Sequence, residues 1–192
     1  MVKEPRPGRV KTRLGKEFGM TRAAWWYRHQ VARTLRRLED PRWTLALAVA
    51  PDREGMMSRV WPAHLPRFKQ GRGNLGDRMR RIFQSIGPAR TVIIGSDIPH
   101  IEKHHIRSAL AGLGSNKGVI GPASDGGYWL IGVDGTTVLP REFLGHVRWS
   151  TPFARSDTMA TAAGWSWAEV AELDDVDTLS DLLRICAKAQ RN

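Results

Sequence analysis

The fold is decided by a short segment that reads TVIIGSDIP, residues 91–99. Its first part is a run of β-branched residues, which predicts a short buried strand over residues 91–95. Asp97 follows this strand. Ligands of open α/β sheets bind at the carboxyl ends of strands, and a carboxylate there can coordinate Mg²⁺ or Mn²⁺. Asp97 is therefore a candidate metal ligand; alternatively, it caps a helix predicted to begin at Pro99.

Strands and helices alternate along the rest of the chain. Strands are predicted where short apolar runs lie between Pro, Gly or polar residues, and helices where apolar residues recur every three to four positions. This alternation predicts one α/β domain, residues 1–192, with a mostly parallel sheet. The predicted strands are 43–50, 91–95, 118–120, 128–133 and 165–172, the predicted helices are 22–38, 75–86, 99–113, 152–163 and 176–189, and the predicted loops are 3–15 and 66–74.

The composition is that of a globular protein. Of the 192 residues, 41% are hydrophobic and 26% are charged, which is enough apolar residues for one sizeable core. The longest apolar run, residues 44–50, is far shorter than the roughly 20 residues that span a bilayer. The one cysteine, Cys186, can form no internal disulfide. The chain begins without an apolar stretch typical of a signal peptide, so we expect a cytoplasmic protein with no membrane partner.

Positive charge is concentrated in the first half of the chain. Residues 1–90 contain 21 Lys and Arg against 7 Asp and Glu, a net charge of +14, whereas residues 91–192 carry −3. A basic half indicates either a solvated surface or a polyanionic partner, which could be nucleic acid, an anionic membrane surface or a phosphorylated small molecule. We interpret Arg36, Arg37, Arg80 and Arg81 as helix-surface charges.

Two glycine-containing basic segments are candidates for binding phosphate. The first reads PGRVKTRL, residues 7–14, and the second reads QGRGNLGDRM, residues 70–79. Glycine lets backbone N–H groups approach a phosphate, Lys and Arg add charge, and helix N-termini bind anions. Asn74 is a plausible N-cap of the helix in the second segment. Neither segment has Walker A spacing, and a basic arm and a structural loop remain the alternatives.

Two acidic segments follow predicted strands. In GPASDGGYW, residues 121–129, Asp125 and its glycines form either an ordinary hairpin turn or a loop that presents Asp125 to a ligand. In DDVDT, residues 174–178, the carboxylates either cap the next helix or supply a second ligand to the metal that Asp97 would hold.

Six segments in this order resemble a known bacterial family. They are PGRVKTRL (7–14), QGRGNLGDRM (70–79), GSDIP (95–99), GPASDGGYWLIG (121–132), WST (149–151) and DVDT (175–178). Together they cover nearly the whole chain and are similar to a family of GT-A-fold glycosyltransferases that is defined as a domain of unknown function. That family is in turn similar to nucleotidyltransferases such as molybdenum-cofactor guanylyltransferases and sugar-nucleotide pyrophosphorylases.

The resemblance implies a nucleotide-diphospho-sugar transferase-like fold, a three-layer α/β/α sandwich that binds a nucleotide and Mg²⁺ or Mn²⁺. It implies that Lys11 and Arg13 hold the nucleotide phosphates, that Asp97 and Asp177 bind the metal, and that Asp125 lies near the acceptor. Lys11, Arg13, Asp97 and Asp125 are the catalytic candidates. The nucleotide-binding candidates are Pro7, Gly8, Arg9, Lys11, Arg13, Gly73, Asn74, Leu75, Gly76 and Ser96.

The chain departs from the family at its start. Members carry a hydrophobic strand before the PGR loop, whereas here only Met1–Pro5 precede it, so we expect a truncated first strand. Loss of a full strand would leave backbone groups of its neighbours unpaired. The start of the chain is misassigned or the protein is a truncated member, and a member without turnover is a further alternative.

The leading hypothesis is metal-dependent glycosyl transfer from a nucleotide-sugar donor to a small-molecule acceptor. One alternative is nucleotidyl transfer from a nucleoside triphosphate to a phosphorylated small molecule, with release of pyrophosphate. A second is a non-catalytic module that binds nucleic acid; against it, aromatic residues are not interleaved with the basic ones. Trp25 and Trp26 could form a homodimer surface, although core packing is their commoner use.

Overall fold

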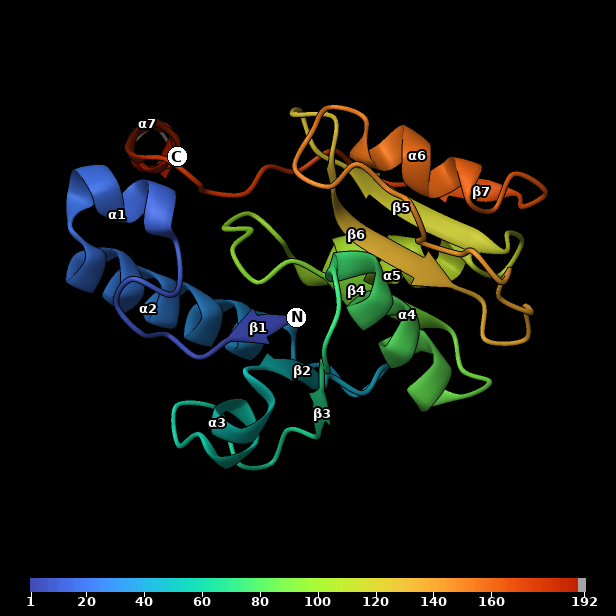
Figure 1. Cartoon of the computed structure of the whole chain (residues 1–192), viewed down its shortest axis with the longest axis horizontal. Helices are drawn as coiled ribbons and strands as arrows, with labels where there is room; N and C mark the ends of the chain where they lie inside the picture. Colours follow the sequence, from blue (N-terminus) through green and yellow to red (C-terminus); the bar gives the residue numbers. More distant parts are fainter. Residues whose placement is uncertain (190–192) are drawn as a thin grey trace. The chain divides into compact units, whose positions relative to one another are not determined.

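The computed structural model describes residues 1–189, which form two compact units (Figure 1). Both units combine a sheet with helices, so the α/β class predicted from the sequence is confirmed. Unit 1 consists of Met1–Lys69, Ser96–Ile101 and the chain from Asp175 onward, and unit 2 consists of Gln70–Gly95 and Glu102–Asp174.

Unit 1 is built on a three-stranded parallel sheet in the order β1-β2-β3. Strand β1 (Val2–Lys3) has two residues, and Val2 lies opposite Val49 of β2 (Leu47–Ala50). The other edge of β2 pairs with β3 (Arg67–Lys69). The helices of unit 1 are α1 (Thr12–Phe18), α2 (Met20–Leu38), α3 (Asp52–Met57) and α7 (Leu179–Ala189).

The long helix α2 supplies one side of the core of unit 1. Its inward side chains recur at helical spacing and include Tyr27, Val31 and Leu35, which cluster with Val49 and Trp61. Helix α1 packs against α2, and α7 packs against α1. The inward face of α2 therefore places Tyr27 inside unit 1, where the site described below is built.

Unit 2 contains a four-stranded sheet in the order β4-β6-β5-β7. Strand β6 runs antiparallel to both of its neighbours, whereas β5 and β7 are parallel. The two central strands are buried because both faces of the sheet are apolar there, as at Val119, Ile120 and Leu130. Helix α5 packs on this sheet and α4 contacts β4. The elements are α4 (Leu75–Ile86), β4 (Thr91–Ile94), α5 (Lys103–Gly112), β5 (Gly118–Pro122), β6 (Tyr128–Val133), α6 (Ala154–Ala160) and β7 (Trp167–Glu169).

The structure corrects several element boundaries. The strand predicted from residue 43 begins at Leu47, because the Trp43 indole N–H donates to the Leu38 carbonyl and holds that residue in a turn. The helix predicted from Pro99 begins at Lys103. Parts of both predicted loops are ordered, as α1 and as β3. Helix α3 was not predicted. The other boundaries that differ are those of the elements that the structure places at 20–38, 91–94, 103–112, 118–122, 154–160, 167–169 and 179–189.

Candidate functional site

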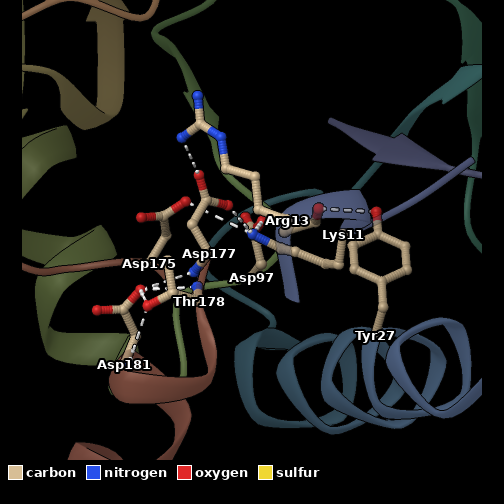
Figure 2. A network of polar contacts seen from close by, with 9 residues as sticks. Lys11, Arg13, Tyr27, Asp97, Asp175, Asp177, Thr178 and Asp181 are labelled. Atoms are coloured by element: carbon tan, nitrogen blue, oxygen red, sulfur yellow. Dashed lines mark hydrogen bonds and ion pairs between the residues drawn. The ribbon is translucent and has the colours of Figure 1, made fainter. Parts of the chain in front are cut away.

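A cationic side chain and three carboxylates meet inside unit 1 (Figure 2). The Lys11 ammonium comes from the turn before α1 and forms an ion pair with Asp97 Oδ2. It lies 2.7 Å from Asp177 Oδ1 and 3.6 Å from Asp175 Oδ2. Arg13 Nη1, in the first turn of α1, lies 3.1 Å from the other oxygen of Asp177. Three segments far apart in the sequence thus converge on one cluster, which we call the carboxylate cluster: Asp97, Asp175 and Asp177.

The members of this cluster differ in their exposure to water. The Lys11 side chain is 6% exposed and that of Asp97 is 20% exposed, whereas the Arg13 side chain is 66% exposed. Burial alone lowers the pKa of the Lys11 ammonium, but the surrounding carboxylates, Asp97 foremost, outweigh burial and raise that pKa above its ordinary value. Lys11 therefore stays protonated, and its positive charge is held away from water.

The backbone of Lys11 adopts a left-handed conformation, with φ 45° and ψ 48°. Non-glycine residues adopt this conformation at a cost of roughly 1 kcal/mol or more, and such residues cluster at functional sites. Glycine would fit this backbone without strain but would provide no ammonium group. The strain at Lys11 thus fits a position where the side chain matters more than the backbone.

Helix α2 holds the segment that carries Asp97. The Tyr27 hydroxyl accepts from the Lys3 backbone N–H at 3.0 Å and shares a hydrogen bond of 2.9 Å with Ser96 Oγ. Arg37 Nη1 donates to two carbonyl oxygens beyond Asp97, those of Pro99 at 2.6 Å and Ile101 at 3.0 Å. Asp97 is therefore fixed from both sides by side chains of one helix.

These contacts overturn two interpretations from the sequence. Arg37 is not a plain surface charge, because it binds carbonyls of the Asp97 segment. Asp97 does not cap α5, which begins at Lys103 after an N-cap at Glu102. Sequence reasoning missed Tyr27 as well, although its place among the apolar residues on the inward face of α2 was a usable signal.

Replacing Tyr27 with Phe is expected to destabilise the protein by about 2 kcal/mol, because the Lys3 N–H loses its acceptor and Ser96 loses its partner. Burial raises the pKa of Tyr27 to about 12, so the hydroxyl is neutral at any ordinary pH. Urea unfolding measures the change. Ser96→Ala is the matched control, since it leaves the Lys3 contact in place and should cost about half as much. Equal stability of wild type and Tyr27→Phe would show that these bonds do not hold the segment.

In the acidic segment before α7, Thr178 takes part in the helix cap, whereas Asp175 and Asp177 belong to the carboxylate cluster. Thr178 and Asp181 bond reciprocally at the start of α7: the Thr178 N–H donates to Asp181 Oδ2 at 2.8 Å and the Asp181 N–H donates to Thr178 Oγ1 at 3.3 Å. Asp175 and Asp177 face Lys11 instead. Asp174, in unit 2, accepts from the N–H and the hydroxyl of Ser124. Helix α7 is thus capped by Thr178 and Asp181 and not by the carboxylates of Asp174 or Asp177, and the second metal ligand stays a prediction.

The carboxylate cluster has the donor set of a divalent-cation site. Asp97, Asp175 and Asp177 each offer one oxygen, and these oxygens lie within 4.8 Å of one another. Carboxylate oxygens are the ligands that Mg²⁺ and Mn²⁺ prefer. The residues present therefore fit the metal that the family resemblance implies, with Asp175 as a member that the sequence did not single out.

The other predicted site residues lie outside the cluster. Pro7, Gly8 and Arg9 form an exposed turn in unit 1, before Lys11. Gly73–Gly76 lie in unit 2, where Asn74 is confirmed as the N-cap of α4 and accepts from the Asp77 N–H at 3.0 Å. Arg81, interpreted as a surface charge, instead donates to the carbonyls of Gln70 and Arg72 and braces this loop.

Asp125 lies in unit 2, in the hairpin between β5 and β6. Its Oδ1 accepts from the Gly127 N–H at 2.8 Å, and the Ala123 N–H donates to the Gly127 carbonyl. Of the two interpretations of this segment, the structure thus shows the hairpin turn. The carboxylate remains exposed, so its role toward an acceptor stays a prediction.

The outward face of α2 is strongly basic and carries an exposed aromatic ring. Trp25 is 65% exposed and its ring lies 3.9 Å from that of His29. This corrects one expectation, because Trp25 is not a core residue. Trp26 is partly buried against the core, as expected. The face consists of Arg22, Trp25, Arg28, His29, Arg33 and Arg36.

Comparison with known proteins places the chain in a family. Residues 34–151 match the family described as "Uncharacterized protein conserved in bacteria (DUF2064)". The chain belongs to this family. The matched stretch includes Asp97 and Asp125 but ends before Asp175 and begins after Lys11. Proteins of curated function give no match.

Two solved structures resemble the family member described here. The crystal structure of a "putative nucleotide-diphospho-sugar transferase" from Desulfovibrio desulfuricans G20 matches with a TM-score of 0.83 and 32% identity, over 100% of this chain and 85% of that one. A Mycobacterium tuberculosis Rv0371c homolog from Mycobacterium sp. strain JC1 matches with a TM-score of 0.55 and 16% identity, over 86% and 83% of the two chains. The first confirms the predicted nucleotide-diphospho-sugar transferase-like fold, and the second supports the fold alone. No helix in the described part of the chain has the length and apolar character needed to cross a membrane.

Proposed function

We propose that the protein is a transferase that takes a glycosyl unit from a nucleotide-diphospho-sugar donor. The observation that carries this proposal is the meeting of Lys11 and Arg13 with the carboxylate cluster in unit 1. A diphosphate needs cations on its oxygens, and a divalent metal needs carboxylates beside them. The likeness to the Desulfovibrio protein supports the same substrate class.

Each side chain has a separate role in this proposal. Lys11 and Arg13 bind the diphosphate and stabilise the negative charge that grows on it as the glycosyl bond breaks. Asp97, Asp175 and Asp177 would hold the divalent cation, which when bound neutralises charge on the departing diphosphate. Tyr27 and Arg37 keep Asp97 in place through Ser96 and the Pro99 carbonyl. Asp125 is the candidate for the acceptor side.

A thermal-shift panel tests the proposal. UDP-, GDP-, ADP- and CDP-sugars, and the four nucleoside triphosphates, are added with and without Mn²⁺. We expect one sugar nucleotide with Mn²⁺ to raise the melting temperature by several degrees, which corresponds to a ligand present at about 100 times its Kd. A response to a triphosphate alone would favour nucleotidyl transfer, the reaction of the molybdenum-cofactor guanylyltransferases.

The panel also has an outcome that contradicts the proposal. If no nucleotide stabilises the protein under any condition, the nucleotide-dependent function is wrong. Salt-sensitive binding of random-sequence single-stranded DNA, measured alongside by fluorescence anisotropy, would then favour the nucleic-acid alternative, with the basic face of α2 as its surface.

A further inference from the structure

The Lys11 ammonium contacts the same three carboxylates that would hold the proposed metal. Lys11 Nζ contacts each member of the carboxylate cluster: it pairs with Asp97 and lies 2.7 Å from Asp177 and 3.6 Å from Asp175. These three side chains are also the ones whose oxygens could surround a cation. One positive charge of the chain thus already occupies the place where a second would bind.

We propose that Lys11 is an internal counter-ion that gives way to the divalent cation when a diphosphate binds, so that the protein binds the metal and the diphosphate with positive coupling. This inference rests on the proposed function. In the ligand-free protein Lys11 neutralises part of the cluster. In the loaded protein its partner is the diphosphate, and the carboxylates bind the metal.

The burial of Lys11 explains why the two ligands should be coupled. A divalent cation and an ammonium group cannot both lie among the same three carboxylates without strong repulsion. A buried ammonium that loses its counter-charge pays a desolvation penalty of several kcal/mol. Metal alone therefore has to displace Lys11 without giving it a new partner, whereas a diphosphate supplies that partner. The four-carbon stem of lysine allows the head group to move between the two.

Thermodynamic linkage makes this coupling measurable from either side. If a diphosphate tightens metal binding by some factor, the metal tightens diphosphate binding by the same factor. Removing Lys11 removes the competitor, so metal affinity in the absence of nucleotide should rise. It also removes a diphosphate ligand, so the coupling should shrink.

Arg13 provides the matched control for the loss of one positive charge. Its guanidinium contacts Asp177 alone in the cluster and its side chain is 66% exposed. Water screens its charge, and it contacts one oxygen at the exposed edge of the cluster and neither Asp97 nor Asp175. Arg13→Gln therefore lowers the local positive charge as Lys11→Met does, without vacating the centre of the cluster.

The experiment measures Mn²⁺ binding by electron paramagnetic resonance, on the full chain, without nucleotide and with saturating UDP or GDP. Lys11→Met is expected to bind Mn²⁺ alone at least about tenfold more tightly than wild type, and Arg13→Gln less than about threefold more tightly. In wild type the nucleoside diphosphate should tighten Mn²⁺ binding at least about tenfold, and in Lys11→Met by clearly less. Complexes of Mn²⁺ with the nucleotide in solution are common to all variants, so differences between variants report the protein.

Three results would overturn the inference or separate it from the proposed function. Equal Mn²⁺ affinity of wild type and Lys11→Met shows that no competition exists. Equal effects of Lys11→Met and Arg13→Gln show that net charge alone is responsible. If no nucleotide binds but Lys11→Met still gains Mn²⁺ affinity, the counter-ion role stands while the proposed function fails. Lys11→Gln serves as a second variant should Lys11→Met fail to fold, because its amide can still donate to the cluster.

Discussion

Asp97→Asn is expected to reduce glycosyl transfer by about a thousandfold or more. Asp97 is the least exposed member of the carboxylate cluster, with 20% of its side chain accessible against 40% for Asp177 and 44% for Asp175. It also forms the ion pair with Lys11. The substitution keeps the size and planarity of the side chain but removes its charge. A neutral amide is a poor ligand for Mg²⁺ or Mn²⁺ and a weak partner for the ammonium.

The measurement is the release of nucleoside diphosphate from the donor that the thermal-shift panel identifies. The variant should also lose most of its stabilisation by Mn²⁺ with that donor. Asp134→Asn is the matched control: Asp134 lies in unit 2, its Oδ1 accepts from the N–H and hydroxyl of Thr136, and an amide oxygen can accept the same bonds. We expect wild-type turnover from Asp134→Asn.

A second readout separates a chemical role of Asp97 from a structural one. If Asp97→Asn unfolds at the same urea concentration as wild type while turnover falls, the carboxylate acts on the ligands. If it retains more than about a tenth of wild-type turnover, which corresponds to less than about 1.4 kcal/mol of lost transition-state stabilisation, the cluster is not the centre of the reaction.

The sequence predicts an element correctly where its apolar periodicity and its capping residues indicate the same bounds. Helix α4 was predicted with the bounds Leu75–Ile86 that the structure shows, because its apolar face, its N-cap Asn74 and its terminal Gly87 all point to the same limits. Helix α1 was missed because Gly15 and the preceding Pro and Gly residues read as a loop. Packing against α2, which buries Leu14 completely, holds the chain there in a helix against its local preference.

The candidate site was predicted in part. Lys11, Arg13, Asp97 and Asp177 were singled out from the order of motifs, and they do meet in unit 1. Asp175 could not be told from Asp174, because one residue of difference in a loop decides which carboxylate faces Lys11 and which binds Ser124. The role of Arg37 was also hidden, since a partner 62 residues away in the sequence leaves no local pattern.

Gly126→Ala is expected to destabilise the protein by about 3 kcal/mol or more, because two separate costs add at this position. Gly126 has a φ of +83°, which side-chain-bearing residues rarely adopt. A Cβ there would also lie 2.2 Å from the Pro152 carbonyl oxygen and 2.6 Å from its Cα. Backbone atoms cannot rotate away as the end of a side chain can, so the β5–β6 turn and the segment that contains Pro152 must separate.

The control is Gly164→Ala, also in unit 2. No atom lies within 4 Å of a Cβ at Gly164, so the change in the free energy of unfolding should stay within about 0.5 kcal/mol. Urea unfolding of both variants gives the comparison. Gly126 follows Asp125, so a destabilised turn should also lower the affinity for any acceptor that contacts Asp125. The affinity for a nucleotide bound by Lys11 and Arg13 should stay unchanged. Wild-type stability of Gly126→Ala would show that Pro152 does not confine this turn, and the contact that fixes Asp125 would then have to be sought elsewhere in unit 2.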